Sequence, residues 1–193
     1  MKLVLATRNA HKVREVSRIL SPYGITVESL PDGVVMPPEH GETFADNALP
    51  KARAAAQALG RRTIADDSGI EAEALGGAPG VRSARYAGEH ASDEENLAKL
   101  LAEAPPGSRL RYVCALAYVD PGVGDERVFT GESRGRLTGQ PRGDRGFGYD
   151  PAFLPDDAPG ELTMAELDDS DKDAISHRGR ALRAFAEWYA NAG

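Results

Sequence analysis

The sequence predicts an α/β protein built on a mixed β-sheet. In the first third of the chain, short apolar runs typical of strands alternate with amphipathic stretches typical of helices. Later, two long apolar runs flank a Pro-Gly turn at residues 120–124, as in a β-hairpin. Because alternation with helices calls for parallel strands and a hairpin for antiparallel ones, we expect both kinds of pairing.

Local signals predict the individual elements. Apolar runs predict strands at residues 2–6, 25–30, 63–65, 109–119 and 126–132, and the run at 70–75 is compatible with another strand. Helical periodicity and capping residues predict helices at about 13–20, 43–59, 92–104 and 176–190. Pro50 should kink or split the second helix, because it lacks the N–H that would bond to Asp46. Residues 134–155 show no clear periodicity.

Size and composition narrow the class of protein. A chain of 193 residues can form one large domain or two small lobes around a real core. Its net charge of −7 argues against a nucleic-acid binder that relies on phosphate contacts. The single cysteine, Cys114, permits no internal disulfide and fits a reducing compartment. We see neither a signal peptide nor a run of transmembrane length, so we expect a cytoplasmic protein without a membrane partner.

Polar residues gather first at residues 7–12, Thr-Arg-Asn-Ala-His-Lys, between a predicted strand and a helix N-terminus. The backbone N–H groups, the helix dipole and Lys12 together suit an anion such as phosphate. A second group combines Glu39 with Thr43, Asn47 and Lys51. Whether these four side chains converge depends on the fold.

The third group, Asp66-Asp67-Ser68, follows the predicted strand at 63–65. The carboxyl ends of strands are where open α/β sheets bind ligands. Adjacent strand residues point to opposite faces, so the two aspartates should have different surroundings. An ordinary Asp-Ser-Gly turn is the alternative interpretation of the same residues.

The fourth group combines the segment Gly-Phe-Gly-Tyr-Asp-Pro at 146–151 with Lys172 and with Ser-His-Arg at 176–178. Phe147 lies between two glycines that add no packing, which is typical of a ring presented for stacking on a base. His177 and Arg178 lie near a helix start, where cations are unfavourable, which suggests a use; a solvated surface pair is the alternative.

These groups together supply carboxylates, cations and an aromatic ring. Carboxylate oxygens suit Mg²⁺, which usually takes one or two of them together with substrate phosphates. Cations suit a polyphosphate and a ring suits a base. A nucleoside triphosphate with Mg²⁺ would use all three, with Glu39, Asp66 and Asp67 as the candidate carboxylates.

At this point the chain resembles the inosine triphosphate pyrophosphatase family, also called dITP/XTP pyrophosphatases. The resemblance rests on T-x-N-x-x-K at 7–12, E-x-G-x-T-F-x-x-N-A-x-x-K-A at 39–52, A-D-D-S-G at 65–69, L-G-G-A-P-G-V-x-S-A-R-Y-A-G at 75–88, G-F-G-Y-D-P at 146–151, A-E-L at 165–167 and K-x-x-I-S-H-R at 172–178. These motifs are ordered and span nearly the whole chain. Arg8, Asp46, Pro50 and Arg82 depart from the family pattern without removing a catalytic position.

The resemblance implies one α/β domain of two lobes over residues 1–193, with a long mixed β-sheet flanked by helices, an active-site cleft between the lobes, and a homodimer. It implies Mg²⁺-dependent hydrolysis of ITP, dITP or XTP to the monophosphate and pyrophosphate. Asp67 would be the catalytic base, and Glu39 and Asp67 would hold Mg²⁺. Asp66 would be either a further metal ligand or a buried structural acid.

The resemblance also implies substrate contacts. Residues 7–12 would hold phosphate, residues 147–150 the base and sugar, Lys172 the nucleotide, and His177 with Arg178 the edge of the base. The substrate-binding set is Thr7, Arg8, Asn9, Ala10, His11, Lys12, Lys51, Ser68, Phe147, Gly148, Tyr149, Asp150, Lys172, His177 and Arg178.

Two alternatives stay open. The same site could serve modified or pyrimidine nucleoside triphosphates, or the protein could sense nucleotides without turning them over. Clustered carboxylates count against a sensor, because a protein that only binds an anion gains nothing from negative charge without a metal.

Overall fold

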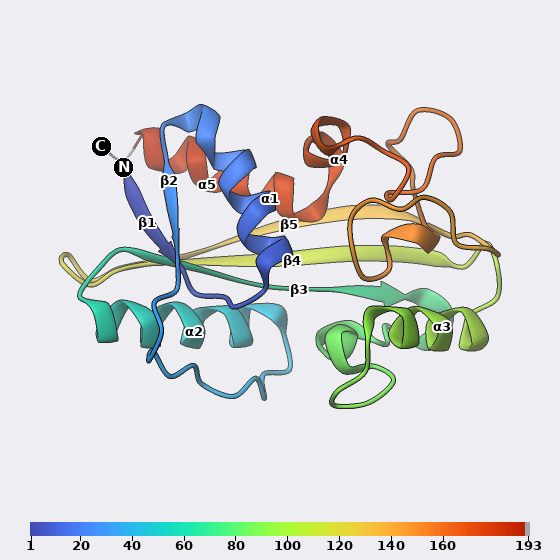
Figure 1. Ribbon diagram of the computed structural model, residues 1–193, viewed down its shortest axis with the longest axis horizontal. Coiled ribbons are helices and arrows are strands. Elements are labelled where there is room, and N and C mark those ends of the chain that lie inside the picture. Colours follow the sequence, from blue (N-terminus) through green and yellow to red (C-terminus); the bar gives the residue numbers. More distant parts are fainter. Residues whose placement is uncertain (192–193) are drawn as a thin grey trace. The chain divides into compact units, whose positions relative to one another are not determined.

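The computed structural model describes residues 1–191, which divide into two compact units (Figure 1). Unit 1 comprises Met1–Asp67, Cys114–Gly131 and Arg178–Gly193, the last described as far as Asn191. Unit 2 comprises Ser68–Val113 and Glu132–His177. Within residues 1–191, no helix is both long and apolar enough to cross a membrane.

A six-stranded sheet forms the framework, with the strand order β2-β1-β3-β4-β5-β6. The strands are β1 (Lys2–Leu5), β2 (Thr26–Ser29), β3 (Thr63–Ala72), β4 (Arg109–Asp120), β5 (Asp125–Leu137) and β6 (Phe153–Pro155). β1 is parallel to both β2 and β3, whereas β5 and β6 are antiparallel. The prediction of an α/β protein with a mixed sheet is therefore confirmed.

In unit 1, helices cover both faces of the strands. α1 (Ala10–Leu20) and α5 (His177–Asn191) lie on one side and α2 (Phe44–Leu59) on the other (Figure 1). The core on the first side joins β1 to α1 and α5 through Leu3, Leu5, Val16, Leu20, Ile64, Cys114, Leu182 and Phe185. Cys114 is buried in a strand, as its apolar context predicts.

In unit 2, α3 (Asp93–Glu103) and the short α4 (Asp169–Ile175) accompany the strands. A second core contains, among others, Ile70, Leu97, Leu100, Tyr112, Phe153 and Met164. α3 begins with the predicted capping box, in which Ser92 and Glu95 each accept a hydrogen bond from the other's backbone N–H.

Two local predictions are wrong. β3 does not stop at Ala65 but continues through Asp66, Asp67, Ser68 and Gly69 as one strand, because the carboxylates find buried partners on both faces. α2 is a single helix through Pro50, so the expected split is wrong, while the expected kink stays a prediction. The lost backbone bond costs about 3 kcal/mol, and the helix offsets this by burying an alanine face made of Ala48, Ala52, Ala55 and Ala56.

The aperiodic region contains more regular structure than its sequence indicates. β5 extends to Leu137, and β6 follows the single turn at Asp150–Ala152. α4 precedes the predicted final helix, whose bounds are otherwise close to expectation.

Candidate active site

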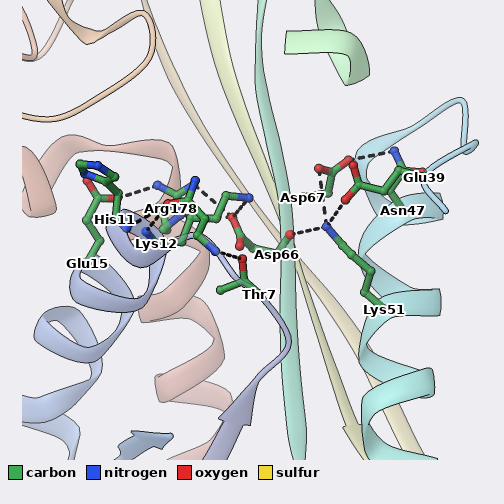
Figure 2. Close-up of polar contacts among 11 residues, drawn as sticks. Thr7, His11, Lys12, Glu15, Glu39, Asn47, Lys51, Asp66, Asp67 and Arg178 are labelled. Atoms are coloured by element: carbon green, nitrogen blue, oxygen red, sulfur yellow. Dashed lines mark hydrogen bonds and ion pairs between the residues drawn. The ribbon is translucent and has the colours of Figure 1, made fainter. Parts of the chain in front are cut away.

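The site in unit 1 is organised around the middle of β3. β1 ends at Leu5, which pairs with Ile64, and β3 continues beyond that point. Asp66 and Asp67 therefore lie just past the carboxyl end of β1, where parallel sheets present ligand-binding groups. Their side chains point to opposite faces of the strand, as predicted (Figure 2).

Asp66 faces two cations. Its Oδ2 lies 3.0 Å from Lys12 Nζ and accepts hydrogen bonds from Arg178 Nη2 at 3.1 Å and Nε at 3.2 Å (Figure 2). Burial alone would raise the pKa of the Asp66 carboxyl, but Lys12 and Arg178 outweigh it and hold the pKa well below its usual range. Asp66 is thus ionised at neutral pH, and these contacts favour the structural acid among its two predicted roles.

The turn at residues 7–12 aims Lys12 at this carboxylate. Asn9 caps α1 by accepting from the backbone N–H groups of His11 at 2.9 Å and Lys12 at 3.2 Å. Thr7 Oγ1 in turn accepts from Asn9 N at 3.2 Å. These side-chain hydrogen bonds satisfy backbone N–H groups at the start of α1. They also fix the direction in which the Lys12 side chain leaves the helix.

Two members of the same turn have contacts elsewhere. Arg8 donates to the carbonyl of Val34 at 3.2 Å and lies 3.8 Å from Asp32. His11 Nδ1 lies 2.9 Å from Arg14 Nη2, at the exposed surface of α1. Their predicted substrate contacts stay predictions.

Arg178 is among the most deeply buried side chains of the described residues, with 2% of its surface exposed. Its Nη1 donates to Glu15 Oε2 at 2.6 Å while Nη2 and Nε bond to Asp66. The guanidinium therefore lies in an ion-pair network of unit 1, and the contact with the edge of the base that the resemblance implies stays a prediction. Burial acts to lower the pKa of Arg178, but Asp66 and Glu15 raise it, so the side chain stays charged.

Glu15 was missed by the sequence analysis. It lies on the buried face of α1 next to Val16 and one helical turn after Lys12. An acidic residue that interrupts the apolar face of an amphipathic helix was the available signal.

The other face of β3 brings together the second predicted group. Asn47 Nδ2 donates to Asp67 Oδ2 at 2.9 Å, and Lys51 Nζ lies 3.8 Å from Asp67 Oδ1 (Figure 2). Lys51 also donates to Glu39 Oε1 at 2.6 Å and to the carbonyl of Asp66 at 2.9 Å. Glu39 and Asp67 thus converge on one ammonium group from α2.

Asn47 is itself held by the loop that carries Glu39. Its Oδ1 accepts from Gly41 N at 2.8 Å. A Cβ on Gly41 would lie 2.5 Å from Asp46 Cβ and 2.7 Å from Asn47 Oδ1, so only glycine fits there without a shift. Thr43 caps α2 in a capping box with Asp46, which fixes the start of the helix beside this loop.

The electrostatics of this face differ from those around Asp66. Burial raises the pKa of the Asp67 carboxyl, and Lys51 and the Asn47 hydrogen bond only partly offset the increase. For Lys51, burial acts to lower the pKa, but Asp67, Asp66 and Glu39 raise it above its usual value. The result is a proton acceptor of raised basicity beside a fixed positive charge.

The residues of this face fit Mg²⁺. Two carboxylates already share one cation, Lys51 Nζ, and Mg²⁺ typically takes one or two carboxylates and completes its shell with water and phosphate oxygens. Within residues 1–191, no group of three or more His, Cys, Asp or Glu side chains could hold a metal ion, so a fully protein-made cage is absent from that part of the chain.

In unit 2, Asp150 brings together two further predicted residues, Lys172 and Phe147. This buried carboxylate accepts from Lys172 Nζ at 2.8 Å and from the backbone N–H of Phe147 at 3.0 Å. Lys172 Nζ also lies 5.2 Å from the centroid of the Phe147 ring, within the range of a cation–π contact. His177 is buried beside Tyr112, which the sequence analysis treated only as part of a strand.

Three other predicted residues have mainly structural surroundings. Tyr149 is buried and donates from its hydroxyl to the carbonyl of Ser83 at 2.7 Å. Gly148 N donates to Asp93 Oδ2 at 2.9 Å, which ties the loop to the start of α3. Ser68 is half-buried within β3. Their substrate contacts stay predictions.

Known proteins resemble this chain along nearly its entire length. A protein of Frankia alni named dITP/XTP pyrophosphatase is 51% identical over 197 aligned positions, covering 96% of each chain. A protein of the same name from Cutibacterium acnes is 48% identical over 95% of this chain and 94% of its own. Among solved structures, a HAM1 protein from Coxiella burnetii has a TM-score of 0.87 at 36% identity, covering 99% of both chains.

The structure of a nucleoside-triphosphatase, also named dITP/XTP pyrophosphatase, from Mycobacterium abscessus has a TM-score of 0.73 at 44% identity, covering 96% of this chain and 98% of its own. The model of the Ham1 family matches residues 3–188. Because this match spans almost all of the sequence, and because the solved structures share both fold and sequence, the chain belongs to the Ham1 family.

Proposed function

We propose that this protein hydrolyses dITP, ITP and XTP to the monophosphate and pyrophosphate in a Mg²⁺-dependent reaction. One observation supports this most directly: Glu39 and Asp67 converge on a single cation on one face of β3, while Lys12 and Arg178 neutralise Asp66 on the other. The relatives named dITP/XTP pyrophosphatase, at 48% and 51% identity, indicate the substrate class.

Asp67 is the group we assign to proton transfer. Its raised pKa makes it a better proton acceptor than an ordinary aspartate. In the reaction, a water oxygen attacks the α-phosphorus and Asp67 accepts a proton from that water. The bond between the α-phosphorus and the oxygen that bridges it to the β-phosphate breaks. Pyrophosphate is the leaving group, and the nucleoside monophosphate is the other product.

Glu39 and Asp67 are the residues that would hold the metal. Bound Mg²⁺ would neutralise charge on the phosphate oxygens, which is the main requirement of phosphoryl transfer. Lys51, already positioned by Glu39 and by the carbonyl of Asp66, supplies a second positive charge on the same face. Lys12 and the turn that carries it are assigned to phosphate binding.

The base and sugar are assigned to Phe147, Lys172 and His177, with Asp150 as the anchor of Lys172. For Arg178, the contacts favour a positioning role, because its guanidinium holds Asp66 and Glu15 in a buried network. We also expect a homodimer, which rests mainly on the family resemblance, and a cytoplasmic location.

A nucleotide panel tests the proposal. Purified protein with Mg²⁺ is given dITP, ITP, XTP, dATP, dGTP and dUTP, and pyrophosphate and orthophosphate are measured separately. We expect pyrophosphate from the hypoxanthine and xanthine nucleotides. Release of orthophosphate with accumulation of the diphosphate would contradict the assigned bond, and preference for dUTP would contradict the assigned base.

A further inference from the structure

Tyr112 connects two of the residues assigned to the base, although nothing in its sequence context marks it as functional. It lies on β4, and its side chain is 6% exposed. In unit 2 its ring stacks on His177 and its hydroxyl bonds to Asp150. A buried tyrosine hydroxyl usually needs a hydrogen-bond partner, and here both the hydroxyl and the ring contact residues of the predicted nucleotide site.

The hydroxyl completes the set of donors around Asp150. Tyr112 donates to Oδ1 at 3.1 Å, while Lys172 and the backbone N–H of Phe147 donate to Oδ2 at 2.8 and 3.0 Å. Hydrogen bonds thus reach both oxygens of the carboxylate, which fixes its plane. Since Oδ2 holds Lys172 and the Phe147 loop, the plane of the carboxylate sets the position of both.

The loop is fitted closely around this carboxylate. Gly146 has a φ of +73°, and a Cβ at this position would lie 2.2 Å from Asp150 Oδ2. The backbone can pass here only because the residue is glycine. Rotation of the carboxylate would therefore disturb the loop. The hydrogen bond from Tyr112, which fixes the plane of the carboxylate, matters more here than it would at a site with free space around the carboxylate.

The ring of Tyr112 orients the second residue. Its centroid lies 4.5 Å from that of the His177 imidazole, and the two rings are within 6° of parallel. The tyrosine ring also makes an edge contact with Phe153, at a centroid distance of 4.8 Å and an angle of 69°. Phe153 and β4 therefore hold the tyrosine, and the tyrosine holds the plane of the imidazole.

We infer that Tyr112 is a positioning residue for recognition of the purine base, acting on Asp150 and Lys172 through its hydroxyl and on His177 through its ring. The inference rests on the proposed roles of Lys172 and His177 in binding the base. It concerns the base end of the nucleotide only, because all of these contacts lie within unit 2 and none involves Lys12, Lys51 or Asp67.

Tyr112→Phe tests the hydroxyl. We expect KM for dITP to rise by roughly two- to tenfold, the range equivalent to one hydrogen bond, with kcat changed less than about twofold because proton transfer at Asp67 is unaffected. IMP, the monophosphate product of ITP, should become a weaker competitive inhibitor by the same factor. Inhibition by pyrophosphate, which lacks a base, should not change.

Tyr118→Phe is the matched control. Tyr118 lies six residues further along β4, is buried, and donates its hydroxyl to Asp120 Oδ2 at 3.4 Å. Removal of that hydroxyl should leave the KM for dITP and both inhibition constants unchanged. The inference is overturned if Tyr112→Phe behaves like Tyr118→Phe, or if it weakens IMP and pyrophosphate equally, which would indicate a general structural effect.

Tyr112→Leu tests the ring without reference to activity. The stacked tyrosine should shift the His177 ring protons upfield in the NMR spectrum, and His177→Gln identifies those signals among the 4 histidines of the chain. We expect Tyr112→Phe to keep the shift and Tyr112→Leu to lose it. An unchanged shift in a folded Tyr112→Leu variant would overturn the stacking part of the inference.

Failure of this inference can be separated from failure of the proposed function. If wild-type protein releases no pyrophosphate from dITP or XTP, the proposed function is wrong. If wild-type protein is active and the IMP inhibition constant does not respond to Tyr112→Phe, the function stands and the role of Tyr112 is wrong. If Tyr112→Leu does not fold, the kinetic result for Tyr112→Phe still decides.

Discussion

Asp66 and Asp67 are neighbours of the same residue type on one strand, yet their surroundings drive their pKa values in opposite directions. Asp66 is buried against two cations at 3.0 and 3.1 Å, which lower its pKa. Asp67 is also buried, but its nearest cation lies 3.8 Å away and its close donor is a neutral amide, so burial prevails and its pKa is raised.

The alternation of side chains along a strand can thus give two adjacent residues different roles. Because successive side chains point to opposite faces, α1 and α5 can supply cations to one aspartate while α2 supplies an amide and a more distant cation to the other. The first aspartate is fixed as a counter-ion. The second keeps the capacity to take up a proton.

The largest expected effect is on the reaction, from Asp67→Asn. The amide is nearly isosteric but is a poor base and a weaker metal ligand, so we expect kcat for dITP to fall by at least about 10²–10⁴-fold. Folding should be unharmed, because the raised pKa means that the ionised Asp67 is disfavoured in the folded state and the substitution removes that penalty. Pyrophosphate release and thermal melting measure the two effects.

Retention of more than about a tenth of wild-type kcat by Asp67→Asn would exclude Asp67 as the base. It would also mean that the difference in pKa between Asp66 and Asp67 does not reflect a role of Asp67 in proton transfer.

Asp66→Asn should show the reverse pattern, with a large loss of stability. Removing the Asp66 charge leaves Lys12 without this counter-ion and Arg178 with Glu15 alone, at a cost of about 3–5 kcal/mol in the free energy of unfolding. Urea denaturation at neutral pH measures this, with Asp67→Asn as the matched control one residue away.

The pH dependence sharpens the same test. The folded-state pKa of Asp66 is lowered, so its stabilising contribution is present above the unfolded-state pKa of about 3.8 and is lost as the pH falls toward the folded value. The difference in stability between wild type and Asp66→Asn should therefore shrink in acid. A difference that stays constant from neutral pH down to about pH 3 would contradict the charge-based explanation.

Glu39→Gln should have an intermediate effect that acts through the metal. The amide keeps one oxygen but loses the charge, so we expect the Mg²⁺ concentration for half-maximal activity to rise by roughly ten- to hundredfold, with activity partly restored at high Mg²⁺. Glu42→Gln, in the same loop and exposed, is the control and should titrate like wild type. A loss of activity in Glu39→Gln that no Mg²⁺ concentration restores would argue against Glu39 as a ligand.

The sequence predicted the polar groups better than their partners. The placement of Asp66 and Asp67 on opposite faces follows from the period of a strand, which is a local feature. The approach of Glu39 to Lys51, in contrast, depends on the fold and could not be predicted from the sequence. The partner of Arg178, Glu15, lies 163 residues away in the sequence, and only the packing of α5 beside α1 brings the two together.

Errors arose where tertiary contacts outweigh local preferences. Asp, Ser and Gly favour turns, yet residues 66–69 belong to β3. Ion pairs and hydrogen bonds to other elements stabilise the extended conformation there. Tyr112 was treated only as a strand residue because its sequence neighbours are apolar. Its contacts with Asp150 and His177 involve residues 38 and 65 positions later in the sequence.

The smallest expected effect concerns how Asn47 tunes Asp67. The amide donates to Asp67 Oδ2 at 2.9 Å and so lowers the pKa that burial has raised. Asp67 must be ionised to accept a proton, and kcat/KM should therefore fall as the pH drops through its pKa. In Asn47→Ala the donor is gone, the pKa should rise further, and this acid limb should move to higher pH by about half to one unit, the equivalent of one hydrogen bond.

The pH profile distinguishes a change in the pKa of Asp67, which we call tuning, from damage to the loop that carries Glu39. Asn47 also accepts from Gly41 N, so its loss could loosen the loop that carries Glu39 and lower kcat/KM equally at every pH. Tuning predicts instead that wild type and Asn47→Ala have similar kcat/KM well above the acid limb and differ most within it. A full profile of kcat/KM against pH with dITP at saturating Mg²⁺ measures both quantities. An acid limb that does not move would mean that the Asn47 hydrogen bond only positions Asp67, and that burial and Lys51 alone set its basicity.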